Sequence, residues 1–205
     1  MSNRPELAGQ SLVVIGGSSG IGLETARRAR DEGARIIITA RNPDRVHRAG
    51  LELGASIAAF DATDFARLER FFDELPAPVD HVMVTAPGPR SARLADLDVE
   101  AARDVVEAQL LLPLQVARNA AGKIRPRGTL LFTGCTAAGL SLGAALPAVT
   151  NALARELAPV RANLIVAGVV DSADVAALAV HLMSNTAVTG ATFEVEGATL
   201  AAAAR

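Results

Sequence analysis

The chain has 205 residues and a formal net charge of −2, so it lacks the excess of basic residues that binds nucleic acid or anionic membranes, and we expect neither partner. Its single cysteine, Cys135, excludes an internal disulfide and a multi-thiol metal site, and we expect no metal. Half of the residues are hydrophobic but only 3% are aromatic, with no Trp and no Tyr, so the core must be built from Ala, Val, Leu and Ile.

Seven short apolar runs alternate with longer amphipathic segments along the chain. In chain order the runs span residues 11–16, 35–40, 56–60, 81–86, 129–134, 162–168 and 192–197. Most of them lack regular polar alternation, which is typical of strands buried on both faces. The alternation of strands and helices predicts an α/β fold with one parallel, doubly wound sheet and helices on both of its faces. No linker or internal repeat divides the pattern, so residues 1–205 are expected to form a single domain.

The helical segments carry start signals and one interruption. Pro43 after Asn42 marks the start of one helix, and Asp61 with Thr63 can cap the next. The longest helical pattern covers residues 97–120, and Pro113 inside it predicts a kink because proline has no N–H to donate. No apolar run has the length of a membrane span and the first residues lack the core of a signal peptide, so we expect a cytoplasmic protein.

Glycines mark the passage from the first predicted strand to the first predicted helix. Gly16, Gly20 and Gly22 have the spacing G-x-x-x-G-x-G. Glycine lets the backbone turn tightly and approach a pyrophosphate, while the start of the helix offers free N–H groups and a partial positive charge. Ser18 and Ser19 add hydroxyl donors. The strand before this turn and the helix after it favour dinucleotide binding over the alternative, a glycine-rich turn that holds no ligand.

The end of the second predicted strand bears on the choice of cofactor. A site that is specific for NAD usually has Asp or Glu here, to accept a hydrogen bond from the ribose 2′-hydroxyl. This chain has Arg41 instead, and a guanidinium suits a 2′-phosphate, so NADP is favoured over NAD. The alternative is that Arg41 is a solvated surface residue. Asp61 follows the third strand, where its side chain reaches the adenine edge or caps the helix that follows.

Four segments of the chain resemble the short-chain dehydrogenase/reductase family. They are "GGSSGIG" at 16–22, similar to the cofactor turn, "FDATD" at 60–64, "ALARELAPVRANLIVAGVVDS" at 152–172 and "DVAALAVHLMSNTAVTGATFEVEG" at 174–197. The likeness covers almost the whole chain in order. It implies a Rossmann-type sheet in the order 3-2-1-4-5-6-7, binding of NAD(P)(H), and homodimers or homotetramers. The cofactor-binding positions that we expect on this basis are Gly16, Ser18, Ser19, Gly20, Ile21, Gly22, Arg41, Asp61, Ala62, Thr85, Ala86, Gly168 and Ser172.

The chain departs from the family pattern at the catalytic positions. In that family a Tyr and a Lys four residues later, on the helix after the fifth strand, carry out proton transfer. Two alignments place either Gly139 and Gly143 or Ala148 and Ala152 at these positions. Neither restores the pair, because the chain has no Tyr and its only lysine, Lys123, precedes the fifth strand.

Other family positions differ as well. Gly134 or Cys135 stands at the position of the Ser that orients the carbonyl, Val84 and Thr85 replace two Asn, Gln109 replaces a third Asn, and Ala167-Gly168 replaces Pro-Gly. The substrate-covering insertion is almost missing, since residues 168–172 run directly into the last helix. Ser172 is then either a contact to the cofactor amide or the N-cap of that helix. Without a lid the reactive face is open unless another subunit covers it.

The residues that remain as weak candidates for chemistry are Thr133, Cys135, Thr136 and Asp171. The first three lie where the reacting carbonyl would be placed. The Cys135 thiol is a nucleophile only if its pKa is lowered, and a lone cysteine at the end of a buried strand is usually an apolar filler. Asp171 is the one carboxylate near the expected carboxyl edge, and its alternative is to cap the next helix. His47, His81 and His181 are interpreted as structural, and His81 begins its strand, away from the edge where ligands bind.

Three functions stay open on the sequence alone. The first is an NADP(H)-dependent oxidoreductase with non-standard acid–base residues and an unidentified small-molecule substrate. The second is a non-catalytic NADP(H)-binding protein or scaffold, paired with an active homologous subunit, because a glycine turn is retained beside a lost Tyr–Lys pair. The third is reuse of the fold for a non-redox reaction such as isomerisation or cyclisation. A fold by itself does not decide between them.

Overall fold

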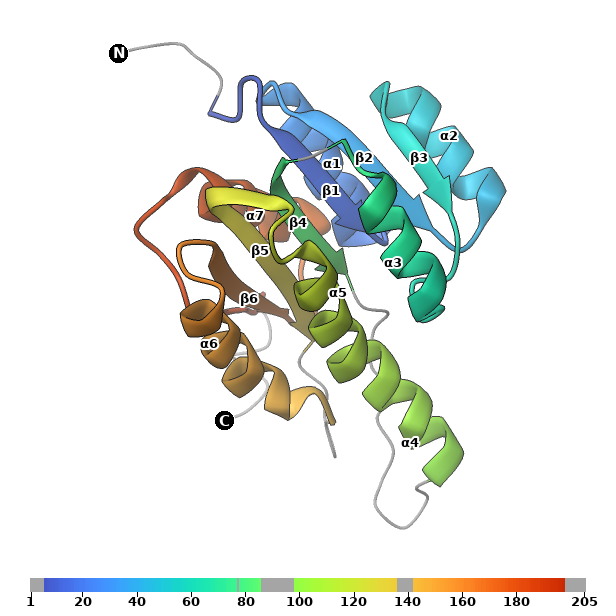
Figure 1. Cartoon of the computed structure of the whole chain (residues 1–205), viewed down its shortest axis with the longest axis vertical. Helices are drawn as coiled ribbons and strands as arrows, with labels where there is room; N and C mark the ends of the chain where they lie inside the picture. Colours follow the sequence, from blue (N-terminus) through green and yellow to red (C-terminus); the bar gives the residue numbers. More distant parts are fainter. Residues whose placement is uncertain (1–5, 77, 86–97, 136–141, 198–205) are drawn as a thin grey trace.

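The protein is built on a parallel sheet of seven strands, seen in a computed structural model that describes residues 6–76, 78–85, 98–135 and 142–197. The strands are β1 (Ser11–Ile15), β2 (Arg35–Ala40), β3 (Ser56–Ala59), β4 (Val79–Thr85), β5 (Ile124–Cys135), β6 (Arg161–Ala167) and β7 (Thr192–Val195). Their order in the sheet is β3-β2-β1-β4-β5-β6-β7, and every neighbouring pair is parallel (Figure 1). The predicted order is confirmed, and each predicted run overlaps its strand, although β5 begins five residues before the run at 129–134.

Helices cover both faces of this sheet, as the doubly wound pattern predicts. The helices are α1 (Gly20–Asp31), α2 (Pro43–Leu53), α3 (Phe65–Glu74), α4 (Val99–Val106), a π-helix (Glu107–Leu111), α5 (Leu112–Ala120), a short 3-10 helix (Leu142–Ala145), α6 (Leu146–Glu156) and α7 (Ser172–Ser184). Figure 1 shows α3, α5 and α6 in front of the sheet and α1 and α7 behind it. The apolar residues form one buried cluster on each face, because parallel strands connected by helices expose neither face to water.

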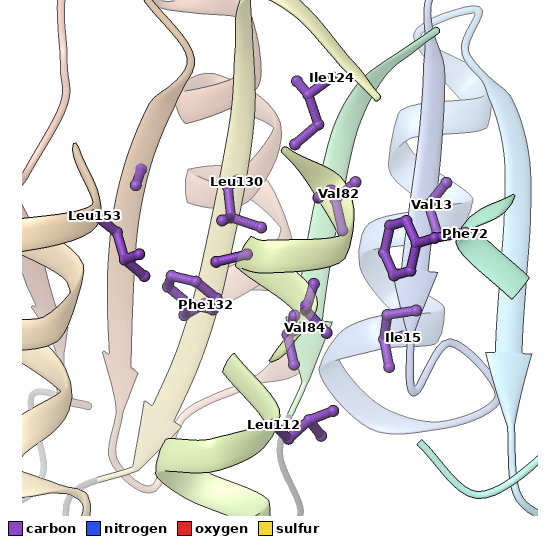
Figure 2. Packing of buried hydrophobic residues seen from close by; sticks show 14 of the residues in the cluster. Val13, Ile15, Phe72, Val82, Val84, Leu112, Ile124, Leu130, Phe132 and Leu153 are labelled. Carbon is purple, nitrogen blue, oxygen red and sulfur yellow. The ribbon is translucent and has the colours of Figure 1, made fainter. Parts of the chain in front are cut away.

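The front cluster shows how aliphatic side chains fill the core. Alternate residues of the central strands point to this face and meet side chains of α3, α5 and α6 (Figure 2). The strand residues are Val13, Ile15, Val82, Val84, Leu130 and Phe132, and the helix residues are Phe72, Leu112 and Leu153. Most of the cluster is aliphatic, in keeping with the low aromatic content of the chain.

Pro113 reshapes the long helical pattern rather than ending it. Proline has no N–H to donate to the carbonyl of Gln109, four residues earlier. The segment Glu107–Leu111 is a π-helix at this point, and the amide of Leu112 donates to the carbonyl of Glu107 instead. The interruption predicted from Pro113 is therefore a wide helical turn between α4 and α5. As Figure 1 shows, α4 continues beyond the carboxyl ends of the strands, where it reaches the candidate site.

The predicted cap of the third helix is wrong. The helix start marked by Pro43 is confirmed, with Asn42 as the cap of α2, but α3 is capped by Asp64, whose carboxylate accepts from the amide of Arg67 at 3.1 Å. The carboxylate of Asp61 accepts from the amide (3.0 Å) and the hydroxyl (2.8 Å) of Thr63, which closes the turn before that helix. The predicted cap by Asp61 and Thr63 fails because the chain makes one further turn before α3 begins.

Candidate functional site

The glycine turn lies between β1 and α1 and is tied to the neighbouring strand. Gly16 has φ of +94°, in the region where residues with a Cβ are strained. The amides of Gly16 and Gly17 both donate to the carbonyl of Thr39 in β2, each at 3.0 Å. Ser19 is the N-cap of α1, with extended backbone and no capping bond from its side chain. The first amides of α1 have no carbonyl partner within the helix and are therefore available as donors at this end of it.

Close packing explains why glycine occupies two positions of this turn. A Cβ on Gly22 would lie 2.5 Å from the carbonyl oxygen of Gly16, and a Cβ on Gly16 would run into the hydroxyl of Thr85. That hydroxyl lies 3.0 Å from the carbonyl oxygen of Ile15 and 3.1 Å from that of Gly16, so it donates to the strand end and the turn together. Thr85, at the end of β4, thus fixes the position of the turn relative to the sheet.

A cavity of about 650 Å³ opens beside this turn, at the carboxyl ends of β1, β2 and β4. A volume of this size is typical of pockets for ligands of cofactor size. The expected cofactor positions that line it are Gly16, Ser18, Ser19, Gly20, Ile21, Gly22, Arg41, Asp61, Ala62 and Thr85. The fold thus brings together residues that are up to about seventy positions apart in the chain, around one space at the edge where α/β sheets hold ligands.

Two expected cofactor positions after β6 lie elsewhere. Gly168 and Ser172 are absent from the cavity lining among the described residues. Asp171 is the N-cap of α7, and its carboxylate accepts from the amide of Ala173 at 2.9 Å, so the alternative that Ser172 is the N-cap is wrong. Asp171 therefore has the capping role that was the alternative to general-base work. The expected positions Ala86 and Thr136 lie outside the described residues.

The remaining candidates for chemistry lie at the end of β5. Thr133 is buried, lines the cavity, and its hydroxyl donates to the carbonyl of Val84 at 3.3 Å. Cys135 is half-buried and is not part of the cavity lining. Burial raises the pKa of the Cys135 thiol above its usual value, which keeps it protonated. This environment is the opposite of what a nucleophilic cysteine needs.

Several residues that line the cavity were not among the cofactor-binding or catalytic positions expected from the sequence. Asn42 and Arg45 from the start of α2 line it next to Arg41, and α4, the π-helix and the start of α5 supply the far wall. That wall consists of Ala101, Asp104, Val105, Glu107, Ala108, Gln109 and Leu112. Arg45 could have been found from the sequence, because it follows Arg41 by four residues on the first turn of a helix whose start Pro43 marks. The residues of the far wall could not have been found from the sequence, because they come to line the same cavity as the glycine turn only after the sheet has formed.

His81, in contrast, sits at the opposite edge of the sheet. It is 2% exposed, and its Nε2 lies 2.6 Å from Oε1 of Gln10. Burial lowers the pKa of His81 to about 4, against an ordinary value of 6.5, so the ring is neutral at physiological pH. This agrees with the structural role expected for it.

The buried His81 predicts a pH dependence of stability. Because its pKa is depressed in the folded state, the unfolded chain binds more protons between pH 4 and 6.5, so its stabilising contribution is present above 6.5 and is lost as the pH falls towards 4. We expect a loss of roughly 3 kcal/mol in the free energy of unfolding across this window. Urea denaturation at several pH values should show a shallower dependence in His81→Gln than in the exposed-site control His181→Gln. Equal slopes in both variants would contradict this role.

Other kinds of site find no support among the described residues. Within the part of the chain that the structure describes, every helix is too short or too polar to cross a membrane. The same residues hold no group of three or more His, Cys, Asp or Glu side chains that could bind a metal ion.

Comparison with protein families and with curated proteins finds similarity to reductases in both. The model for the family described as enoyl-(acyl carrier protein) reductase matches residues 15–179. The short-chain dehydrogenase/reductase ATR9 of Stachybotrys chlorohalonatus is 31% identical over 196 residues, which cover 80% of this chain and 75% of that protein. The 3-oxoacyl-[acyl-carrier-protein] reductase MabA of Mycobacterium tuberculosis is 27% identical over 185 residues, covering 82% of this chain and 72% of that protein.

Solved structures show the same fold at lower identity. BdcA in complex with NADPH superposes with a TM-score of 0.86 at 21% identity, over 94% of this chain and 95% of that one. The MalC reductase/Diels-Alderase of Malbranchea aurantiaca also has a TM-score of 0.86 at 21% identity, over 97% of this chain and 98% of that one. Similarity at this level of identity supports the architecture and leaves the chemistry to the residues of the site.

Proposed function

The chain belongs to the short-chain dehydrogenase/reductase family, and on this premise we propose that it binds NADP(H) in the cavity beside the glycine turn. The observation that carries the proposal is the convergence of the glycine turn, Arg41 and Thr85 on one cavity of about 650 Å³. The cofactor diphosphate would lie against the first amides of α1, where N–H donors and the helix dipole favour an anion. The nicotinamide of the bound cofactor supplies hydride transfer.

The preference for NADP over NAD rests on the charge at the end of β2. Arg41 is exposed and lines the cavity where an NAD-specific site has a carboxylate. A guanidinium pairs with a 2′-phosphate through charge-assisted hydrogen bonds, whereas it offers little to a neutral 2′-hydroxyl. Asp61 also lines the cavity, and one of its carboxylate oxygens accepts from Thr63. We propose that Asp61 faces the adenine edge of the cofactor.

The proposed activity is that of an oxidoreductase that lacks the family's tyrosine acid. The chain has no Tyr, and its one lysine, Lys123, precedes β5 at the opposite edge of the sheet and lies 3.7 Å from Asp73. General acid–base catalysis contributes typically about 10²–10⁴-fold to a rate. A carbonyl substrate bound near Thr133 would accept hydride without a strong proton donor among the described cavity residues, so we expect slow carbonyl reduction.

The same loss supports a second candidate function, a non-catalytic NADP(H)-binding protein. The turn and the charge that hold a dinucleotide are retained while the proton-transfer pair is missing. In this form the chain would act as a single domain, as a homodimer or homotetramer or beside an active homologous subunit.

Two measurements separate these functions. Calorimetric titration with NADP and NAD tests the binding site, and we expect NADP to bind more tightly. Oxidation of NADPH over a broad panel of carbonyl compounds then tests the chemistry. Binding with turnover above background supports the oxidoreductase, and binding without turnover supports the non-catalytic protein. If neither dinucleotide binds at millimolar concentration, both functions are wrong.

A further inference from the structure

A second arginine shares the cavity with Arg41. Arg45 lies on the first turn of α2, is exposed, and lines the cavity together with Arg41 and Asn42. Arg48, one turn further along the same helix, does not line it. Its Nε lies 3.4 Å from the carbonyl oxygen of Asp44. Two arginines, one at the end of β2 and one at the start of α2, therefore line the cavity, and the next arginine of the helix does not.

The backbone that carries Arg45 is held rigidly against the glycine turn. The side chain of Asn42 accepts from the amide of Arg45 at 2.8 Å, and Pro43 restricts the backbone at the first position of the helix. Thr39, two residues before Arg41, accepts from the amides of the glycine turn. The end of β2, the start of α2 and the diphosphate site are thus connected by hydrogen bonds, so the distance from the turn to both arginines is set by the fold.

Neither Arg41 nor Arg45 takes part in an ion pair with a described carboxylate, although Asp61, Asp104 and Glu107 also line the cavity. Among the described residues, the ion pairs on the neighbouring helix α1 include Arg27 with Glu24 and Glu52, whereas none includes Arg41 or Arg45. Two guanidinium groups that line one cavity and are held in no ion pair repel each other modestly, and a bound dianion relieves that repulsion. A phosphate also offers enough acceptor oxygens for two guanidinium groups at once.

We propose that Arg45 is a second ligand of the ribose 2′-phosphate, so that the site selects ligands that contain adenosine 2′-phosphate through a pair of arginines. This inference rests on the proposed NADP(H) binding and adds a residue to its specificity. Arg41 reaches the phosphate from the end of β2 and Arg45 reaches it from the first turn of α2. The helix N-terminus between them contributes a favourable dipole to the same anion.

The test uses the full-length protein and ligands that lack the nicotinamide. Adenosine 2′,5′-bisphosphate carries the 2′-phosphate, and 5′-ADP lacks it while keeping the diphosphate. Calorimetric dissociation constants for both ligands are measured for the wild type, Arg45→Ala and the matched control Arg48→Ala, which removes the same charge from the same helix. We expect Arg45→Ala to weaken binding of the bisphosphate by about 10-fold or more, with 5′-ADP unchanged, because a charge-assisted hydrogen bond is lost. Arg48→Ala should change neither constant by more than about 2-fold, as expected for a screened surface charge.

The possible failures are distinguishable. If Arg45→Ala and Arg48→Ala weaken binding equally, the effect is one of general charge and the assignment of Arg45 is overturned. If Arg45→Ala weakens both ligands alike, Arg45 does not read the 2′-phosphate. If the wild type binds 5′-ADP as tightly as adenosine 2′,5′-bisphosphate, and NAD as tightly as NADP, dinucleotide binding stands and the arginine pair fails. If the wild type binds none of them, the proposed function fails first.

Discussion

Gly22→Ala is expected to lower the affinity for NADP(H) by about 100-fold or more, which corresponds to roughly 2.7 kcal/mol. The added methyl would lie 2.5 Å from the carbonyl oxygen of Gly16 and 3.1 Å from the hydroxyl of Thr85. Neither group can yield cheaply, because the Gly16 amide is bonded to Thr39 and the Thr85 hydroxyl is bonded to the turn. Relief requires the turn to move away from α1, which disturbs the amides proposed to hold the diphosphate.

Titration of NADP, together with thermal unfolding, measures this effect and separates it from a general loss of stability. Gly54→Ala is the matched control, because Gly54 ends α2 with φ of +61° and an added methyl there meets nothing within 4 Å. That control should lose about 1 kcal/mol of stability from backbone strain and keep its cofactor affinity. A Gly22→Ala protein that binds NADP as tightly as the wild type would contradict the proposed position of the diphosphate.

Arg161→Met is expected to lower the free energy of unfolding by about 4 kcal/mol. Arg161 starts β6 and is only 5% exposed. Its guanidinium donates to the carbonyls of Leu182 (2.6 Å), Asn185 (2.8 Å) and Met183 (2.9 Å), which lie at the end of α7. Methionine fills a similar volume but leaves these buried carbonyls without donors, and it removes the positive charge that the negative end of the helix dipole favours.

Chemical denaturation, monitored by far-ultraviolet circular dichroism because the chain has no Trp or Tyr, measures the change. Arg155→Met serves as the control, since Arg155 is exposed on α6 and its replacement should change the free energy of unfolding by less than about 0.5 kcal/mol. Comparable denaturation midpoints for the two variants would show that Arg161 does not anchor α7 to the sheet.

Much of the fold follows from local patterns that need no tertiary context. Apolar runs without polar alternation predict buried parallel strands, and the runs at 35–40 and 56–60 match the bounds of β2 and β3 to within a residue. The burial predicted for the second of these runs is wrong, because β3 lies at the edge of the sheet and is largely exposed. The start of α2 is equally local, because Asn42 and Pro43 act through the cap and the fixed backbone angle of the same turn. The strand order came from the resemblance of the sequence to a known family, since local patterns do not specify which strands pair.

The residues of the candidate site also fall into those that the sequence predicts and those that only the structure identifies. The glycine spacing and Arg41 could be predicted from the sequence, because each acts close to its own position, in a turn or at the end of one strand. The capping alternative for Asp61 is wrong, since a helix start can shift by one turn where Asp61, Thr63 and Asp64 are all able to cap it. The alternative that Ser172 caps α7 is wrong for the same reason, because the adjacent Asp171 caps that helix.

The sequence by itself determined the alternation of strands and helices, the glycine turn and the absence of a tyrosine acid, because these depend on residue identity and on short-range spacing. Only the tertiary structure decided which residues share the cavity. The Thr85 hydroxyl bonds to the carbonyl of Gly16, some seventy residues away in the chain, and residues of α4 line the same cavity as Arg41. It also separated Arg45 from Arg48 and placed Cys135 outside the cavity, because burial and direction depend on the packing of the whole sheet.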